Sequence, residues 1–486
     1  MYACGLLFAQ RAAMSVAIVA MTRGIETESE SMKKVNNQIY HCGKSNQTDT
    51  VLQMNQFTNE SISLSTINHG EFDWNQKLQG VILGSIFYLY CIVPLFAGRL
   101  TDSIGPKWIT FVGLLFPCLL NAIIPFSVRL AGANALIVIQ TLIGGFHGCI
   151  YPSLFSINLK WFSPNERANA NAGIIAGGSF GNSIAYLISG YLSQSSIGWP
   201  LVFYVLSLLH VPWLILWLYF ITNDPMKNKH VSDKELIFIK ENVPPKKVRS
   251  KVRPPWLRIM SSPTVLGSII TKCANSFGFF MLTSKMPSFL YTIFGVPIVK
   301  NGMFSALATS STGVSSIIAS ILANRLITRY QIRSIIVRKL MQALSMIGPA
   351  LALITITLLE CDINSIIIII FTGMFLYGFV TGGEFTIVSD FAPNFAGTVV
   401  GVIFFLPFVQ GILAPYLVGF VLDYDAPLSL NEKWNIIFYF TAGLYILGMI
   451  TFILTADDKQ QDWDKEANAK MSKPNVQQIS MNTEEE

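Results

Sequence analysis

Charged side chains are scarce in this sequence, and their scarcity argues against a soluble protein. Only 13% of the 486 residues are Asp, Glu, Lys or Arg, whereas 52% are hydrophobic and the mean hydropathy is +0.49. A soluble chain of this length needs more charge to cover its surface. The apolar residues also lie in long blocks, whereas soluble cores scatter them at helix or strand period. The lipid bilayer is therefore the expected solvent.

Signatures of catalysis are missing as well. The sequence contains no H-E-x-x-H motif and no paired C-x-x-C motif. Gly43-Lys44-Ser45 matches the end of a phosphate-binding loop, but Gln38 stands where that loop requires glycine. We therefore expect neither an enzyme nor an ATP-driven pump. No metal site is expected, and no cofactor other than a co-transported Na⁺ or H⁺.

Long apolar runs are what the sequence has instead. About 20 apolar residues in a helix span a hydrocarbon core of about 30 Å. Eleven runs approach or exceed this length, at residues 78–98, 108–128, 133–159, 169–192, 200–221, 263–293, 302–324, 340–359, 363–389, 396–422 and 434–455. The run Tyr2–Met21 makes a twelfth. It could also be a signal peptide, but Arg11 interrupts its apolar stretch. The prediction is an all-α membrane protein of twelve transmembrane helices.

Basic residues predict the orientation of these helices. Loops on one side carry 19 Lys and Arg residues, against three in the short loops opposite, which are Arg129, Lys300 and Lys433. Short loops rich in Lys and Arg face the cytoplasm. Both termini and the central loop are therefore predicted to be cytoplasmic, in a plasma membrane or a lysosomal or vesicular membrane.

The predicted helices divide into two sets of six. Residues 1–222 form the first bundle, residues 223–262 a cytoplasmic central loop, residues 263–455 the second bundle, and residues 456–486 a disordered cytoplasmic tail. Two pseudo-symmetric bundles are typical of transporters that hold their substrate between the halves. The exoplasmic loop 22–76 carries two N-x-S/T sequons, at Asn46 and Asn59, which predict glycosylation unless they arose by chance.

One short motif follows the second predicted helix. The segment Gly98-Arg99-Leu100-Thr101-Asp102-Ser103-Ile104-Gly105-Pro106-Lys107 resembles the G-x-L-a-D-x-x-G-[RK]-[RK] loop of the major facilitator superfamily. Asp102 can accept hydrogen bonds from Arg99, Lys107 or a helix terminus, so the loop could act as a conformational latch. Arg325 stands in a weaker copy of the motif six helices later. The alternative is a plain polar turn.

Longer stretches narrow the resemblance to the anion transporter family of type I sodium-phosphate cotransporters, sialin and vesicular glutamate transporters. The segment from Arg11 to Met21 resembles that family's first helix. Asp390-Phe391-Ala392-Pro393-Asn394-Phe395-Ala396-Gly397 resembles its D-x-A/S-P-x-Y/F-A-G signature, which adds Asp390 to the predicted latch. The insect-type inorganic phosphate cotransporters look most similar. The resemblance covers nearly the whole chain and implies the major facilitator fold, but it does not identify the anion.

Arg11 is the leading candidate for a substrate-binding residue. A guanidinium keeps its charge, so its place halfway along a membrane helix is costly unless it meets water or an anion. A carboxylate or phosphate bound there would offset that cost. The resemblance also implies a role in anion handling. The alternatives are a permanent structural ion pair and a side chain that snorkels to the membrane surface.

Three further candidates share one face of the fourth predicted helix. Gln140, His147 and Tyr151 are spaced by seven and four residues, which aligns them along a helix. Sialin-like relatives would have Arg at Gln140 and Glu at both Ile143 and His147, so those relatives' proton-coupling carboxylates are absent. His147 is either a proton or substrate group, or a hydrogen-bond donor within the bundle.

The second half offers fewer candidates. Asn275 could contact substrate or Na⁺, or make a hydrogen bond between helices. Lys285 could bind substrate or snorkel toward the outer surface. Glu384 could couple a cation, or pair with a basic residue near the cytoplasm.

Together these features predict a symporter of inorganic phosphate or small organic anions, driven by a Na⁺ gradient. The first alternative is a proton-coupled lysosomal or vesicular transporter of sialic acid-like or glutamate-like anions. A second alternative, from another class, is a receptor that binds an anion without moving it. The expected partners are a small anionic solute, a co-transported cation and the bilayer, but no nucleic acid.

Overall fold

The computed structural model describes residues 1–22, 70–162, 164–242, 255–359, 362–384, 387, 391–392 and 396–466. Asn46, Asn59 and Asp390 lie outside these residues, as do the side chains of Arg99 and Asp102. The predicted glycosylation sites and part of the predicted latch therefore stay predictions.

The N-terminal bundle makes six crossings. Its helices are α1 (Tyr2–Met21), α4 (Gln76–Ser85), α5 (Phe87–Tyr90), α6 (Pro94–Ile104), α7 (Pro106–Gly148), α8 (Ile150–Trp161), α9 (Pro164–Ser193) and α10 (Pro200–Phe220). The second crossing comprises α4, α5 and α6, and α7 holds the third crossing and most of the fourth. Within α7, Gly132 takes a φ of 62° and a ψ of −147°, which lets the chain reverse between the two crossings.

The break in the second crossing differs from the continuous helix predicted over 78–98. Pro94 has no backbone N–H to continue a helix, and α6 begins at this residue. The broken segment also lies very close to α7, because a Cβ at Gly144 would be only 1.7 Å from the carbonyl oxygen of Ile86. Glycine at this position is therefore what lets the fourth crossing pack against the second.

The C-terminal bundle also makes six crossings. Its helices are α13 (Pro263–Phe294), α14 (Ile298–Thr328), α15 (Ser334–Leu358), α16 (Ile363–Tyr377) with the 3₁₀ segment η2 (Gly378–Gly382), α18 (Ala396–Asp423) and α19 (Leu430–Thr455). The segment between the bundles carries η1 (Pro225–Lys227), α11 (Asp233–Asn242) and α12 (Trp256–Ser261).

Among the described residues, nine helices are individually long and apolar enough to cross a membrane. One of them, Pro106–Asn158, contains two crossings. The broken second crossing and the polar, glycine-rich fifth crossing complete the set. The prediction of twelve membrane helices in a two-bundle fold is therefore confirmed.

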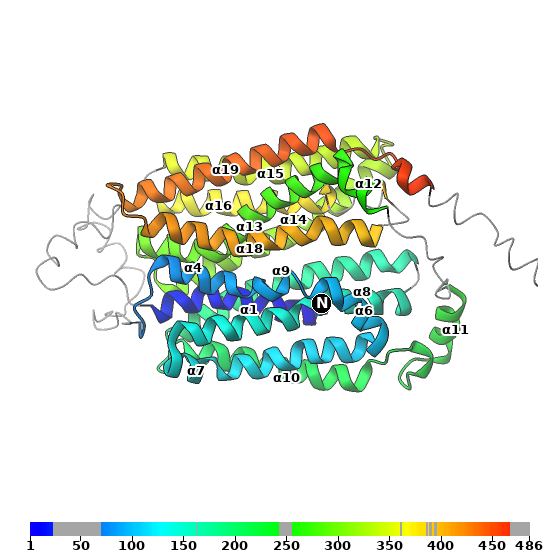
Figure 1. Ribbon diagram of the computed structural model, residues 1–486, viewed down its shortest axis with the longest axis horizontal. Coiled ribbons are helices and arrows are strands. Elements are labelled where there is room, and N and C mark those ends of the chain that lie inside the picture. The colour runs from blue at the N-terminus through cyan, green and yellow to red at the C-terminus, as the bar shows by residue number, and fades with distance from the viewer. Residues whose placement is uncertain are drawn as a thin grey trace, which may run out of the picture.

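The two bundles lie against each other along a shared long axis (Figure 1). We use "outer end" for the end that carries Thr22 and Gly70, and "inner end" for the end that carries α11 and α12. Among the described residues, two helix pairs make most of the contacts between the bundles, α4 with α18 and α9 with α14, and α1 also packs against α13. Glycines bring the first pair together, since a Cβ at Gly80 would be 2.3 Å from the carbonyl oxygen of Pro415.

Polar contacts between the bundles gather toward the outer end. The carboxylate of Asp423, at the end of α18, accepts hydrogen bonds from the backbone N–H groups of Gln76 and Lys77 at 3.1 and 2.6 Å. These N–H groups begin α4, so a carboxylate there also meets the positive end of the helix dipole. Lys285 donates to the backbone and side-chain oxygens of Gln76 at 3.5 and 3.4 Å. The outer end is thus held closed.

Candidate functional site

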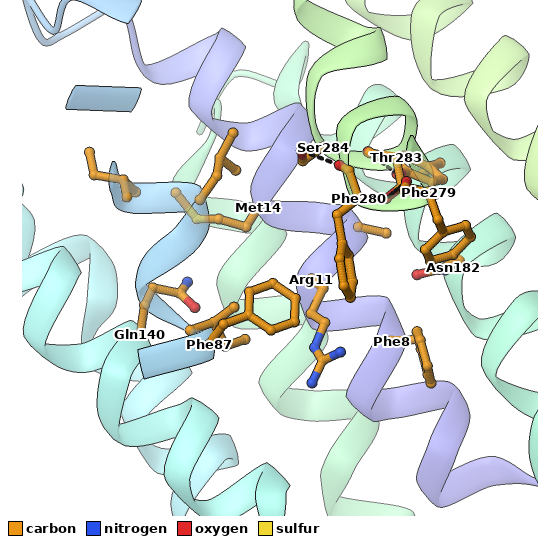
Figure 2. Close-up of a pocket in the computed structure, with 15 residues that line it drawn as sticks. Phe8, Arg11, Met14, Phe87, Gln140, Asn182, Phe279, Phe280, Thr283 and Ser284 are labelled. Atoms are coloured by element: carbon orange, nitrogen blue, oxygen red, sulfur yellow. Dashed lines mark hydrogen bonds between the residues drawn. The ribbon is translucent and has the colours of Figure 1, made fainter. Parts of the chain in front are cut away.

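A cavity of about 50 Å³ lies between the bundles. A single water needs about 10 to 15 Å³ on this measure, so the cavity has room for a small solute. Its walls come from both halves and are mostly apolar; they include Phe8, Arg11, Met14, Ile82, Phe87, Gln140, Asn182, Tyr186, Phe279, Phe280, Thr283 and Ser284. Figure 2 shows Arg11 extending from α1 between Phe8 and Phe87.

Arg11 is surrounded by aromatic rings. The guanidinium carbon lies 4.2 Å from the ring centre of Tyr90, 4.9 Å from that of Phe87 and 5.4 Å from that of Phe8. Each such contact stabilises a cation by about 0.5 to 2 kcal/mol, depending on its exposure. The rings therefore recover part of the cost of holding this charge away from water.

The hydrogen-bonding capacity of Arg11 is left incomplete. Its Nε and Nη2 atoms are buried without a hydrogen-bond partner, and none of the ion pairs seen among the described residues includes it. Neither alternative considered for Arg11 fits this placement, because the side chain is neither tied to a described carboxylate nor extended to the membrane surface. Two unused donors on a fixed, planar cation are suited to receive the oxygens of a carboxylate.

Three polar side chains lie close enough to Arg11 to interact with its charge. They are Tyr90, His147 and Tyr151, from α5, α7 and α8. His147 is fully buried, and both of its ring nitrogens lack a hydrogen-bond partner. The structure thus brings His147 and Tyr151, two of the predicted substrate-binding residues, close to Arg11. Tyr90 was missed, because nothing in its local sequence separates it from the neighbouring aromatic residues.

Gln140 lines the cavity, two helical turns from His147. Seven residues of helix correspond to a rise of about 10 Å, so the two side chains lie at different depths. The Gln140 Nε2 atom is buried and unpartnered, so it can also donate to a solute. Figure 2 shows Gln140 beyond Phe87 as seen from Arg11.

Sequence reasoning also missed the polar residues of α9 and α13 in the cavity wall. Asn182 lines the cavity from α9. The Thr283 and Ser284 hydroxyls donate to the carbonyl groups of Phe279 and Phe280 one turn earlier in α13. Hydroxyl groups are common on membrane helices, so only the packing of α13 on the N-terminal bundle could single these two out.

The remaining candidates of the second half do not line this cavity. Lys285 is fully buried in the outer contact with Gln76, so it does not snorkel to the surface as one reading of the sequence expected. Glu384 forms an ion pair with Lys272 of α13, with 3.3 Å between Nζ and Oε1. Asn275 lies beside the Glu384 carboxylate. The six predicted substrate-binding residues are thus divided among three places.

The predicted latch segment packs inside the N-terminal bundle. Gly105 takes a φ of 101°, and a Cβ there would be 2.5 to 2.7 Å from the side chain of Asn223. The backbone N–H of Lys107 donates to Asn223 at 2.9 Å, and its ammonium group donates to the carbonyl of Leu218 at 2.9 Å. The Cβ position of Gly98 faces open space, and the side chain of Arg325 is exposed at the inner end of α14. Asn223 is therefore a partner of this loop that the sequence did not reveal.

Sequence comparisons match this chain to a protein family and to individual relatives. Residues 50–415 match the model of the Major Facilitator Superfamily. The chain is 27% identical over 459 residues to a protein of Drosophila ananassae named "Putative inorganic phosphate cotransporter", a match that covers 94% of this chain and 91% of that protein. It is 26% identical over 393 residues to human sialin, covering 81% and 78% of the two chains.

A solved structure supports the fold. A bacterial homologue of the human lysosomal transporter Spinster, in an inward-facing and unoccupied conformation, superimposes with a TM-score of 0.66. The match covers 95% of this chain and 98% of that structure at 12% sequence identity, so it shows a shared fold alone.

Proposed function

Because this chain belongs to the major facilitator superfamily, we propose that it is a secondary active transporter that carries a small anion bound at Arg11. The two bundles rock about the cavity, which faces alternate sides of the membrane in turn. The observation that carries the proposal is a guanidinium in the cavity wall with two buried donors that have no hydrogen-bond partner. A cation without a paired carboxylate, placed where two mobile halves meet, is suited to bind and release an anion.

The lining of the cavity favours an organic anion over inorganic phosphate. Phosphate near neutral pH carries between one and two charges and is strongly hydrated, so its burial requires many donors. This cavity offers one guanidinium, two amides and several hydroxyl groups that are already bonded to backbone. Aromatic and aliphatic side chains make up the rest. A monocarboxylate with an apolar body matches both parts of this lining.

A cation gradient supplies the work in this proposal. The sequence placed Na⁺ first and H⁺ second as the coupled ion, and the Na⁺ expectation rests on the resemblance to sodium-phosphate cotransporters. We take the inner end, where the basic loops lie, as cytoplasmic. The structure then corresponds to a state closed toward the exoplasm or lumen. Residence in the plasma membrane and residence in a lysosomal or vesicular membrane both accord with this orientation.

Transport into proteoliposomes tests the proposal. Purified protein is reconstituted, and the uptake of labelled benzoate, urate, sialic acid, glutamate and phosphate is measured under an imposed Na⁺ or pH gradient. Arg11→Ala should lower the uptake of the carried anion about 100-fold, because a charge-assisted pair in a low-dielectric site is lost. Arg129→Ala is the matched control, because Arg129 is an exposed arginine that pairs with Glu71.

Two results would contradict the proposal. Correctly inserted Arg11→Ala protein that transports at the unmodified rate would remove Arg11 from the site. Anion binding without movement under either gradient would instead support a receptor.

A further inference from the structure

The C-terminal bundle contains a buried charge pair that the anion site does not use. Lys272 of α13 and Glu384, just beyond η2, are 6% and 3% exposed, and 3.3 Å separates their charged atoms. Among the described residues, Glu384 is the only buried carboxylate in a membrane crossing or directly next to one. Ionisable groups in such positions are costly and usually serve ion or proton pathways.

The surroundings of Glu384 are built to hold its carboxyl group in place. Gln342 of α15 donates to Oε2 at 3.3 Å, and its side-chain oxygen accepts the backbone N–H of Glu384 at 3.1 Å. The fit is tight, because a Cβ at Gly383 would be 2.7 Å from that same oxygen. Arg338, one turn before Gln342, donates to the carbonyl of Gly382 at 3.1 Å. Arg338 and Gln342 of α15 thus fix the backbone at Gly382 and at Glu384, and Gln342 also fixes the carboxyl group.

Polar capacity remains unused around this carboxyl group. Both amide atoms of Asn275 and the hydroxyl of Tyr445 are buried without a hydrogen-bond partner, whereas Glu384 Oε1 faces the Lys272 ammonium group at 3.3 Å. Asn275 lies beside the carboxylate, and the Tyr445 ring packs against α13 at Gly278, one turn farther on. A purely structural ion pair would be expected to have these groups satisfied, since each unsatisfied buried polar group is costly. The cluster therefore has the composition of a site that changes its protonation state.

We propose that Glu384 takes up the proton whose gradient drives anion transport, and that Lys272 holds it ionised until then. This inference rests on the proposed function. The step is the transfer of one H⁺ from water to the Glu384 carboxylate, which becomes a neutral carboxylic acid and leaves Lys272 with an unmatched positive charge. The reverse step releases the H⁺ on the opposite side of the membrane.

A proton fits this site better than Na⁺. A sodium ion would have to share the Glu384 carboxylate with an ammonium group already 3.3 Å away, and the two cations repel each other. A proton instead neutralises the carboxylate and needs no space beside Lys272. The other titratable groups close to Glu384 are Cys273 of α13 and Tyr377 of α16. Tyr445 of α19 lies near Tyr377, and Arg338 of α15 is bonded to the carbonyl of Gly382, two residues before Glu384. Thiol, phenol, ammonium and guanidinium groups ordinarily carry their protons already near neutral pH, so the Glu384 carboxylate is the group here with a vacant position for a proton.

Charge balance then links the proton to the anion. An anion on Arg11 removes one positive charge from the interface between the halves, and a proton on Glu384 restores one. The loaded and empty carriers therefore have the same net charge. Binding of either ligand favours binding of the other, and this linkage is reciprocal.

Two transport modes measured on the same vesicles test the inference. Unmodified protein is compared with Glu384→Gln for labelled benzoate uptake driven by a pH gradient, and for benzoate exchange at equal pH. Glu384→Gln should lower pH-driven accumulation at least about tenfold but keep exchange within about twofold, because exchange requires the anion site alone. Glu466→Gln, an exposed carboxylate in a surface pair with Arg258, is the matched control.

A double variant separates proton coupling from a structural role. If the pair only supports the fold, Lys272→Met/Glu384→Gln should recover pH-driven uptake by removing both charges at once. If Glu384 carries the proton, the double variant should still exchange benzoate but remain uncoupled.

The remaining outcomes distinguish failure of this inference from failure of the proposed function. pH-driven uptake that survives in Glu384→Gln, or that returns in the double variant, overturns the inference and leaves the proposed function standing. Unmodified protein whose uptake follows Na⁺ at every pH also overturns it. Unmodified protein that moves none of the tested anions in either mode contradicts the proposed function itself.

Discussion

Arg11 of the N-terminal bundle and Lys272 of the C-terminal bundle are both held away from water, but their surroundings differ. In the N-terminal bundle, Arg11 lies among aromatic rings with two donors unused and no described carboxylate paired with it. In the C-terminal bundle, Lys272 is held 3.3 Å from Glu384. A solitary buried charge is unstable without a visiting counter-ion, whereas a paired charge is already neutral. This contrast underlies our proposals that the first bundle binds an anion and that the second exchanges a proton.

The largest effect on stability should come from breaking the pair. Lys272→Met leaves the Glu384 carboxyl buried without its counter-charge, which typically costs about 3 to 5 kcal/mol. Arg11→Ala removes a charge that no described carboxylate balances, and this relief offsets the loss of its contacts with aromatic rings, so stability should fall much less than in Lys272→Met. Thermal unfolding of both variants in detergent checks this difference. Equal destabilisation by the two substitutions would show that Arg11 is paired after all.

An intermediate effect should follow from giving Arg11 a permanent partner. Gln140→Glu places a carboxylate in the same cavity wall. Opposite charges on the order of 10 Å apart at an effective dielectric constant of 20 attract by about 1.7 kcal/mol, so anion affinity should fall roughly tenfold. Competition binding of benzoate to purified protein measures this, and Gln140→Met is the control that removes the amide without adding charge. Affinity that falls equally in both variants would assign the effect to the lost amide.

The smallest effect is expected at an exposed pair. Arg129 donates two hydrogen bonds to Glu71 at the outer end, and these bonds lower the pKa of the Glu71 carboxyl. The stabilisation is therefore present above the ordinary pKa of Glu and is lost as pH falls through the lowered value, so it survives at a mildly acidic lumenal pH. Because both side chains are exposed, Glu71→Gln should cost well under about 1 kcal/mol.

Unfolding curves of Glu71→Gln at pH 7 and near pH 3 check this prediction. The small difference from unmodified protein should shrink at the lower pH. A difference that grows on acidification would contradict the prediction, because the pair would then stabilise the fold more at low pH than at pH 7.

The membrane fold could be predicted because hydrocarbon imposes a strong rule on the sequence. A run such as 200–221 must be long and apolar to cross, and the helix found there is Pro200–Phe220. The broken second crossing could not be predicted in the same way, because the run 78–98 remains apolar through the break. Pro94 explains the start of α6, whereas the break at Ile86 is understood only from the close approach of Gly144 to that residue.

Part of the site could also be predicted, because charged residues are rare in membrane helices. A charge such as Arg11 stands out in an apolar run, and the spacing of His147 and Tyr151 gives their shared face. The pairing of Lys272 with Glu384 joins residues more than 100 positions apart, and no local pattern encodes that contact. The same holds for Tyr90 and Asn182, which become recognisable only when the helices are packed around Arg11.

A structure solved with a transported anion bound is the most direct test of the central claim. The account predicts anion oxygens within hydrogen-bonding distance of Arg11 Nε and Nη2, about 2.7 to 2.9 Å away. It also predicts that the apolar part of the anion lies against Phe87 and Phe280. An anion bound elsewhere, with the Arg11 guanidinium tied to a carboxylate of the protein, would contradict it.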